Sequence, residues 1–283
     1  MSKLYEEIKI LHPSHDVNLE TRTFYADKGV PVIAYCVGLG GCARVDRLVE
    51  GLVGKGYSIR TFSPRNSGLS TGSFTIEDLV ADSSLVIKDI TNKTGVKPYA
   101  SGHSLNGYAL ARILGEGNCV ERAVLLAPIL TPTEQNPKVV DWYLQRILKK
   151  HKITQTLKLS LQIYMKLVSP SRKGVNQQEV IYLDEQRFSK KDVFPFLASL
   201  YSAQPCSSKM QTPTAVFLTG KTNFGIRIKN LNPLKATWQS LQATGSFVEI
   251  YQNLNHYFSK RAGFFNSKKN KEIIDKIARF FKL

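Results

Sequence analysis

The sequence has little cysteine and lacks long apolar runs. Its 283 residues include four cysteines, and none of them forms the closely spaced pairs of a zinc site, so we expect buried free thiols and no metal centre. The cysteines are Cys36, Cys42, Cys119 and Cys206. No stretch approaches the ~20 apolar residues of a membrane-spanning helix. The N-terminus, MSKLYEEIKI, lacks the basic-then-apolar order of a signal peptide. We therefore predict a soluble cytoplasmic protein.

Acidic residues are scarce beside basic ones. The chain has 39 Lys and Arg against 22 Asp and Glu, a formal net charge of +17. A field of this sign attracts anions such as nucleic acid, acidic lipid headgroups or a negatively charged substrate or carrier, although solubility explains it equally well. The sequence shows no helix-turn-helix, zinc-finger spacing or RNA-binding aromatic motif, so nucleic acid is the least favoured partner.

Strand-like and helix-like segments alternate over most of the chain. The expected strands cover residues 6–13, 18–26, 31–39, 57–64, 97–104, 121–129, 212–220 and 246–252, and the expected helices 43–56, 75–95, 105–117, 232–242 and 270–283. The first two strands form a hairpin, and the later ones are apolar enough to be covered on both faces. This alternation predicts an α/β fold with a mainly parallel central sheet flanked by helices.

The alternation breaks between residues 131 and 206. This segment is helix-like, and from Trp142 to Gln178 it contains no Asp or Glu but eight Lys and Arg among apolar residues. We expect one core made of residues 1–130 and 207–283, with a helical cap insertion at 131–206. An apolar face with a basic rim would suit an acyl substrate with an anionic head or carrier, or an acidic membrane surface. The alternative is a cap packed on the core whose lysines are only solvated.

A candidate nucleophile lies where a strand meets a helix. The sequence Gly102-His103-Ser104-Leu105-Asn106-Gly107 contains Gly-x-Ser-x, which places Ser104 at a sharp strand-to-helix turn. The usual pattern ends in glycine, and Asn106 stands at that position with Gly107 next to it. A serine in this context is the nucleophile of acyl-transfer chemistry.

At these residues the chain resembles the α/β-hydrolase family, in particular members with a helical cap that act on esters, thioesters and acyl groups. The first parallel strand ends in Val37-Gly38-Leu39-Gly40-Gly41, similar to the His-Gly-x-x-x of the family, with valine where histidine is common. The resemblance implies an oxyanion hole made by the backbone N–H groups of Leu39 and Leu105. The segment from Ser63 to Ser70 partly matches the structural turn Asp-x-Arg-Gly-x-Gly-x-Ser.

The general base should be a histidine after the last strand. Asn255-His256-Tyr257-Phe258 looks like the His-aromatic-aromatic run of the family. The four other histidines are placed differently: His12 and His15 in the first turn, His103 inside the elbow with its ring turned into the protein, and His151 in the insertion. We therefore predict His256 as the base.

The acid expected by the resemblance is replaced. In the stretch Gly220-Lys221-Thr222-Asn223, asparagine stands where the family has aspartate. Its amide oxygen accepts a hydrogen bond from an imidazole but does not offset an imidazolium charge. Three interpretations stay open: Asn223 orients His256, a carboxylate from Glu249, Glu134 or Asp192 substitutes for it, or the site is inactive.

The sequence thus predicts a cofactor-independent serine hydrolase or acyl-transfer enzyme, of esterase, thioesterase or lipase type. It would cleave a small-molecule carboxylic ester or thioester with Ser104, His256 and Asn223. The competing hypothesis is a catalytically silent member that binds a ligand or partner through the same pocket. The acyl group, the leaving group, the final acceptor and the oligomeric state are not indicated by any motif.

Overall fold

The structure, a computed structural model, describes most of the predicted core. The described residues are 5–26, 31–36, 43, 45–129, 180–183, 186–189, 199, 203, 206–220, 230–258 and 270–283. Most of the expected cap insertion, 131–206, therefore lies outside the described residues.

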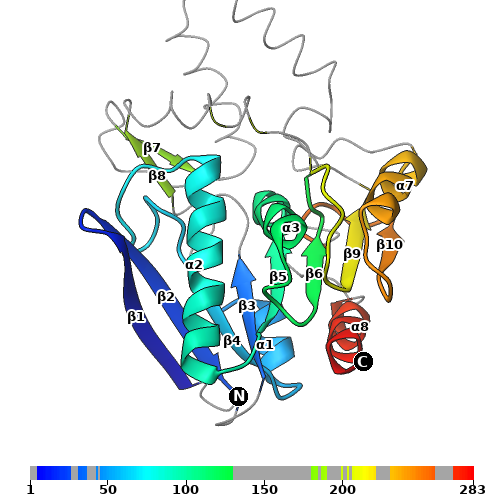
Figure 1. Cartoon of the computed structure of the whole chain (residues 1–283), viewed down its shortest axis with the longest axis horizontal. Helices are drawn as coiled ribbons and strands as arrows, with labels where there is room; N and C mark the ends of the chain where they lie inside the picture. The colour runs from blue at the N-terminus through cyan, green and yellow to red at the C-terminus, as the bar shows by residue number, and fades with distance from the viewer. Residues whose placement is uncertain are drawn as a thin grey trace, which may run out of the picture.

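A central sheet of eight strands organises the described chain (Figure 1). Its order is β1-β2-β4-β3-β5-β6-β9-β10. The strands are β1 (Tyr5–Ser14), β2 (Val17–Tyr25), β3 (Val32–Cys36), β4 (Ser58–Phe62), β5 (Tyr99–His103), β6 (Ala123–Leu126), β9 (Thr214–Thr219) and β10 (Phe247–Tyr251). β2 pairs antiparallel with both of its neighbours, and all other pairs are parallel. The prediction of an N-terminal hairpin beside a mainly parallel sheet is confirmed.

Helices cover both faces of this sheet. They are α1 (Arg47–Val53), α2 (Ile76–Thr94), α3 (Leu105–Glu116), α7 (Asn232–Ser240) and α8 (Asn270–Lys282). One apolar core lies between the sheet and α2, α3 and α7, and a second lies between the sheet and α1 and α8. β4, β6 and β9 are buried along their whole length, as expected for strands covered on both sides.

Short-range signals fix where α2 begins and ends. Thr75 caps its N-terminus by accepting from the backbone N–H of Asp78, whose side chain bonds back to the Thr75 backbone. This is a capping box. At the other end Gly95 adopts φ +73° and its N–H bonds to the carbonyl of Thr91, which closes the last turn. The helix therefore presents a fixed N-terminal turn at the carboxyl edge of the sheet.

The insertion contains strands where we expected helix. β7 (Val180–Leu183) and β8 (Gln186–Ser189) pair antiparallel as a separate two-stranded sheet. The expectation of a helical cap is therefore wrong for these residues. Their sequences, VIYL and QRFS, are separated by two residues and contain β-branched and aromatic side chains, which favour a hairpin.

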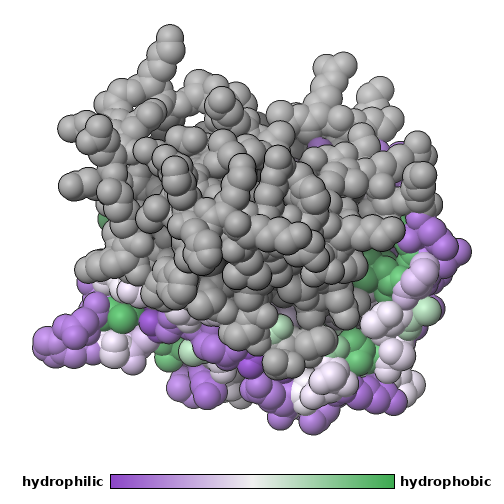
Figure 2. Space-filling view, turned by 90° about the horizontal axis from the view of Figure 1, so that it is seen from above, coloured by the Kyte–Doolittle hydropathy of each residue, from purple (hydrophilic) through white to green (hydrophobic). Residues whose placement is uncertain are grey.

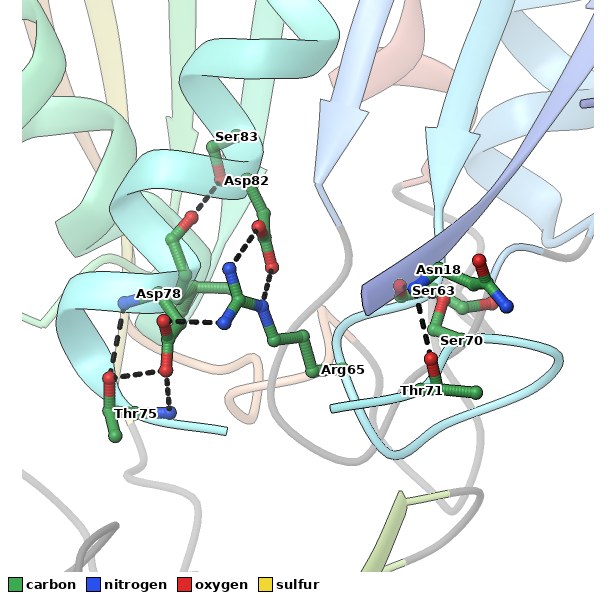
Figure 3. A network of polar contacts seen from close by, with 10 residues as sticks. Asn18, Ser63, Arg65, Ser70, Thr71, Thr75, Asp78, Asp82 and Ser83 are labelled. Carbon is green, nitrogen blue, oxygen red and sulfur yellow. Dashed lines mark hydrogen bonds and ion pairs between the residues drawn. The ribbon is translucent and has the colours of Figure 1, made fainter. Parts of the chain in front are cut away.

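The loop after β4 is held to α2 by a buried ion pair. Arg65 forms two hydrogen bonds of 3.0 Å with the carboxylate of Asp82, whose side chain is 1% exposed, and one of 2.6 Å with Asp78 (Figure 3). The paired, planar geometry is specific to a guanidinium group. Arg65 therefore fixes the start of this loop to α2.

The same loop is fastened to β2 by Glu20. The Ser63 hydroxyl and the Leu69 N–H donate to the buried carboxylate at 2.8 Å each, and Arg22 pairs with it at 2.7 Å. Burial alone would raise the pKa of Glu20, but these hydrogen bonds outweigh it and lower the pKa. Gly68 adopts φ +54°, and a Cβ there would overlap the same carboxylate. Glu20 is therefore the carboxylate around which the turn closes, and Ser63 stands at the position of the family's aspartate.

Exposed apolar side chains of the described residues are scattered. The larger ones are Ile8, Val45, Leu69, Val96 and Leu283. Seen from above, the described surface that is visible is mainly hydrophilic, with hydrophobic residues in separate small areas (Figure 2). No helix in the described part of the chain is long and apolar enough to cross a membrane.

The Arg65 pair gives a test of the loop anchor. We expect Arg65→Lys to lower the free energy of unfolding by about 2 kcal/mol, because one ammonium group does not satisfy the buried Asp82 carboxylate bidentately. Arg112→Lys is the matched control. Arg112 on α3 pairs with Glu77 on α2, whose side chain is 67% exposed, and we expect a change within about 0.5 kcal/mol. Urea unfolding measures both. Equal losses in the two variants would contradict the anchoring role.

Candidate active site

Ser104 lies on a strained turn between β5 and α3. Its backbone adopts φ +57° and ψ −120°, its residue is 3% exposed, and its N–H donates to the carbonyl of Leu126 at 2.9 Å. A non-glycine residue in this region is held there by its surroundings at a cost of about 1–3 kcal/mol. Gly102 makes the turn possible, because a Cβ on it would come within 2.6 Å of the Asn106 carbonyl oxygen. The predicted nucleophile elbow is therefore present.

Asn106 stands where the sequence pattern has glycine, and the next residue, Gly107, is the glycine that makes the close approach. A Cβ on Gly107 would lie 2.9 Å from the Cβ of Pro128 and 3.1 Å from the Gly102 carbonyl oxygen. The close approach of α3 to the strands thus takes place at Gly107. Asn106 is 1% exposed and fits at the position where the family pattern has glycine.

His256 follows β10 in a compact loop. The Leu254 N–H donates to the Tyr251 carbonyl at 3.1 Å and the Phe258 N–H to the Asn255 carbonyl at 2.9 Å. The Asn255 side chain also accepts from the Tyr257 N–H at 3.0 Å. His256 is 3% exposed. The sequence-predicted base is therefore buried at the edge of the sheet where the strands β5 and β10 end.

The structure brings this loop against the elbow. Nε2 of His103 lies 2.9 Å from the carbonyl oxygen of His256, and the two rings have centroids 4.7 Å apart. Because a carbonyl only accepts, His103 Nε2 is the donor. The residue before the predicted nucleophile therefore contacts the residue predicted as the base.

Burial keeps both histidine rings neutral. It lowers the pKa of His103 to about 4, although the bond to His256 acts in the other direction. The pKa of His256 is well below its ordinary value, first because of burial and second because of His103. Nε2 of His256 is buried without a hydrogen-bond partner among the described residues. The neutral ring is the form that can accept a proton, but the same burial opposes the imidazolium that a base must form. Among the described residues no hydrogen bond joins Nε2 to the Ser104 hydroxyl.

Gly220 brings the end of β9 against the loop that leads to His256. Its N–H donates to the Tyr251 carbonyl at 3.1 Å, and a Cβ on Gly220 would overlap the backbone of Gln252. Only glycine allows this close approach. Asn223 follows three residues later but lies outside the described residues, as do Leu39, Val37, Glu134 and Asp192. Leu105 is described and begins α3, where backbone N–H groups have no partner within the helix.

Glu249, one of the alternative acids, is engaged elsewhere. Its carboxylate lies 2.5 Å from Nζ of Lys276 on α8, and Lys276 also pairs with Glu272 at 3.0 Å. The Tyr251 hydroxyl lies 3.4 Å from the same ammonium group. The carboxylate of Glu249 is thus paired on the side of β10 that faces α8, and the structure gives it no hydrogen bond with His256.

The structure describes three of the four cysteines. Cys36 is buried and free, as expected, whereas Cys119 and Cys206 are free but only partly buried. Cys42 lies outside the described residues. In the part of the chain that the structure covers, no group of three or more His, Cys, Asp and Glu could hold a metal ion.

Sequence reasoning missed two functional contacts. It placed the His103 ring inside the protein, which the structure confirms, but gave no role to its bond with His256. It also missed Glu20, which supports the turn at Ser63; the Ser63 hydroxyl in turn accepts from the Ala43 N–H at 2.9 Å. Ala43 follows the segment proposed to form the oxyanion hole. No local pattern signals either contact, because both join residues far apart in the chain.

Comparison with known proteins gives one family and many similar folds. A family model described as "Hydrolase_4: Serine aminopeptidase, S33" matches residues 31–257. A comparison with curated proteins finds no significant match. The solved structure of DcsB with its substrate analogue is similar, with a TM-score of 0.70 at 14% identity over 98% of both chains.

Two named hydrolases are also similar in structure. A monoacylglycerol lipase of Paleococcus ferrophilus has a TM-score of 0.56 at 16% identity, covering 93% of this chain and 97% of that one. An esterase of Pyrococcus furiosus has a TM-score of 0.61 at 12% identity, covering 99% and 92%. At these identities the likeness shows the fold.

The buried histidines predict a loss of stability in acid. An unfolded chain protonates histidine near pH 6.5, so between pH 6.5 and about 4 it binds protons that the folded His103 does not, and the free energy of unfolding falls as the pH falls. For His103 this loss amounts to about 3 kcal/mol. We expect His103→Gln to reduce it by that amount and His12→Gln, at an exposed position of β1, to leave it unchanged. Urea unfolding at several pH values measures the slope; parallel slopes in all three proteins would refute the prediction.

Proposed function

The chain belongs to the Hydrolase_4 family, described as serine aminopeptidase S33, and on that premise we propose that it cleaves a carboxylic ester or thioester with Ser104 and His256. The observation that carries the proposal is the strained, buried Ser104 on the elbow, with the His256 loop bonded to the preceding residue. The named lipase and esterase among the similar folds favour an ester over a peptide bond.

The chemistry follows from these positions. Ser104 Oγ attacks the carbonyl carbon while His256 accepts the hydroxyl proton, and the carbonyl oxygen takes the negative charge of the tetrahedral intermediate. The backbone N–H groups of Leu105 and Leu39 stabilise this oxygen. The leaving alcohol or thiol then departs with the proton from His256, which leaves an acyl group on Ser104. Water, the acceptor in a hydrolase, then attacks the acyl carbonyl carbon as His256 takes its proton; the bond between Ser104 Oγ and the acyl group breaks, His256 returns the proton to Ser104 Oγ, and the acid leaves.

Asn223 is proposed to orient the base. Gly220 packs on the backbone of Gln252, so the segment that leads to Asn223 starts beside the loop of His256. An amide oxygen accepts the hydrogen bond of a neutral imidazole but does not balance the positive charge that develops on it. The proposal therefore includes a turnover below that of a site with aspartate.

Covalent labelling tests the nucleophile and the base. We expect a fluorophosphonate probe to label the wild-type protein, Ser104→Ala not to be labelled, and His256→Ala to react at least about 100-fold more slowly, because a positioned base contributes 10²–10⁴ in rate. Ser101→Ala is the matched control: it removes a buried hydroxyl from the same strand and should label like wild type. A folded wild-type protein without labelling would refute the enzyme and favour the silent binder. A series of p-nitrophenyl esters and acyl thioesters then ranks the acyl groups.

The acid position is tested in the same assay. We expect Asn223→Asp to raise the labelling rate by about 10-fold or more, since the opposite exchange in a serine protease costs about 10⁴ in turnover. Asn230→Asp adds the same charge at an exposed site before α7 and controls for the change in net charge. An unchanged rate in Asn223→Asp and in Asn223→Ala would show that this residue does not orient His256.

A further inference from the structure

His103 joins two parts of the site that are separated in the sheet. It ends β5 and precedes Ser104 directly, and its residue is 4% exposed. Its ring packs against the rings of His256 and Tyr257, with centroid distances of 4.7 and 6.0 Å. In the sheet, β6 and β9 lie between β5 and β10. The contact therefore spans from the central strand of the elbow to the loop that follows the last strand.

The hydrogen bond of His103 fixes one tautomer of its ring. The carbonyl oxygen of His256 accepts at 2.9 Å, so the proton of the neutral ring is on Nε2. The bond goes to the backbone of His256 and leaves the His256 ring nitrogens available for chemistry. It therefore holds the base without competing with the proton transfer.

Three of the other hydrogen bonds described above for this loop close within it, and one joins its start to Gly220 after β9. Leu254 bonds to Tyr251, and both Tyr257 and Phe258 bond to Asn255. These bonds shape the loop and join it to β9, and none of the four involves a residue of the elbow. Because His103 is the covalent neighbour of Ser104, its bond to the loop sets the base relative to the nucleophile.

We propose that His103 is a positioning residue that ties the backbone of His256 to the strand carrying Ser104. The inference rests on the proposed function and deepens it. A triad aspartate orients the imidazole through its ring; in this chain asparagine stands at that position, and the tether of the backbone supplies part of the orientation. A displacement of about 1 Å between reacting groups costs about 100-fold in rate, so a tether of this kind has a direct effect on turnover.

Two variants test the aromatic ring of His103 and its hydrogen-bond donor separately. His103→Phe keeps an aromatic ring and loses the hydrogen bond, whereas His103→Gln keeps an N–H donor and loses the ring. Tyr57→Phe is the matched control, because it removes another buried bond to a backbone carbonyl, that of Ala278 at 3.0 Å. Each variant is examined by ester turnover against pH, thermal unfolding and NMR titration of the histidine side chains.

We expect His103→Phe to lower kcat by about 10–100-fold with KM within about 2-fold. The acid limb of its pH profile should lie above that of His103→Gln, because both variants lack the His103 ring and only in His103→Phe does a loosened His256 gain water, which raises its pKa toward the ordinary value. His103→Gln should recover part of kcat. Tyr57→Phe should lose a similar amount of thermal stability and keep the kcat and pH profile of the wild type.

Two outcomes overturn the proposals separately. If the wild type turns over esters and His103→Phe behaves like Tyr57→Phe, His103 has only a structural role and the positioning proposal is wrong. If the wild type is neither labelled nor active, the proposed function fails, and the NMR titration still decides the tether. Both variants lack the His103 ring that lowers the His256 pKa, so a His256 pKa higher in His103→Phe than in His103→Gln supports the tether, and equal values refute it.

Discussion

The backbone of Ser104 is the constraint on which the rest of the site depends. A serine at φ +57° requires that α3 start almost in contact with β5, and side chains at Gly102 or Gly107 would prevent this. The strain is stored where the chain passes from strand to helix. It turns the serine out of the regular strand while its N–H stays bonded to β6 through Leu126. Everything else in the site is placed relative to this turn.

Buried polar groups fasten the loops around the elbow. Arg65 binds the loop after β4 to α2, and Glu20 binds it to β2. The Ser63 hydroxyl accepts a hydrogen bond from the Ala43 N–H and so joins this loop to the chain that follows β3. These groups are satisfied by one another, so their burial costs less than that of isolated charges. The charged side chains of this layer are therefore structural, and the histidines are the groups left for chemistry.

The sequence was sufficient for the sheet and for the turn that carries Ser104. Apolar strand-length runs between helical patterns define parallel strands, and parallel strands end at one edge, where the residue before Ser104 contacts the His256 loop. The hairpin β7–β8 was missed because its strands are short and stand within a helix-like segment. The bond from His103 to His256 depends on the path of a loop, which no spacing encodes. Asn223 and Leu39 lie outside the described residues, and their roles stay predictions.

The Ser63 hydroxyl and the Glu20 carboxylate depend on each other. The carboxylate beside Ser63 comes from Glu20 on β2, 43 positions earlier in the chain, and the Ser63 hydroxyl donates to it at 2.8 Å. An aspartate at position 63 would bring a second carboxylate beside the first, and a neutral residue at position 20 would leave the turn without any. The effects of substitutions at positions 20 and 63 on the free energy of unfolding are therefore expected to be non-additive.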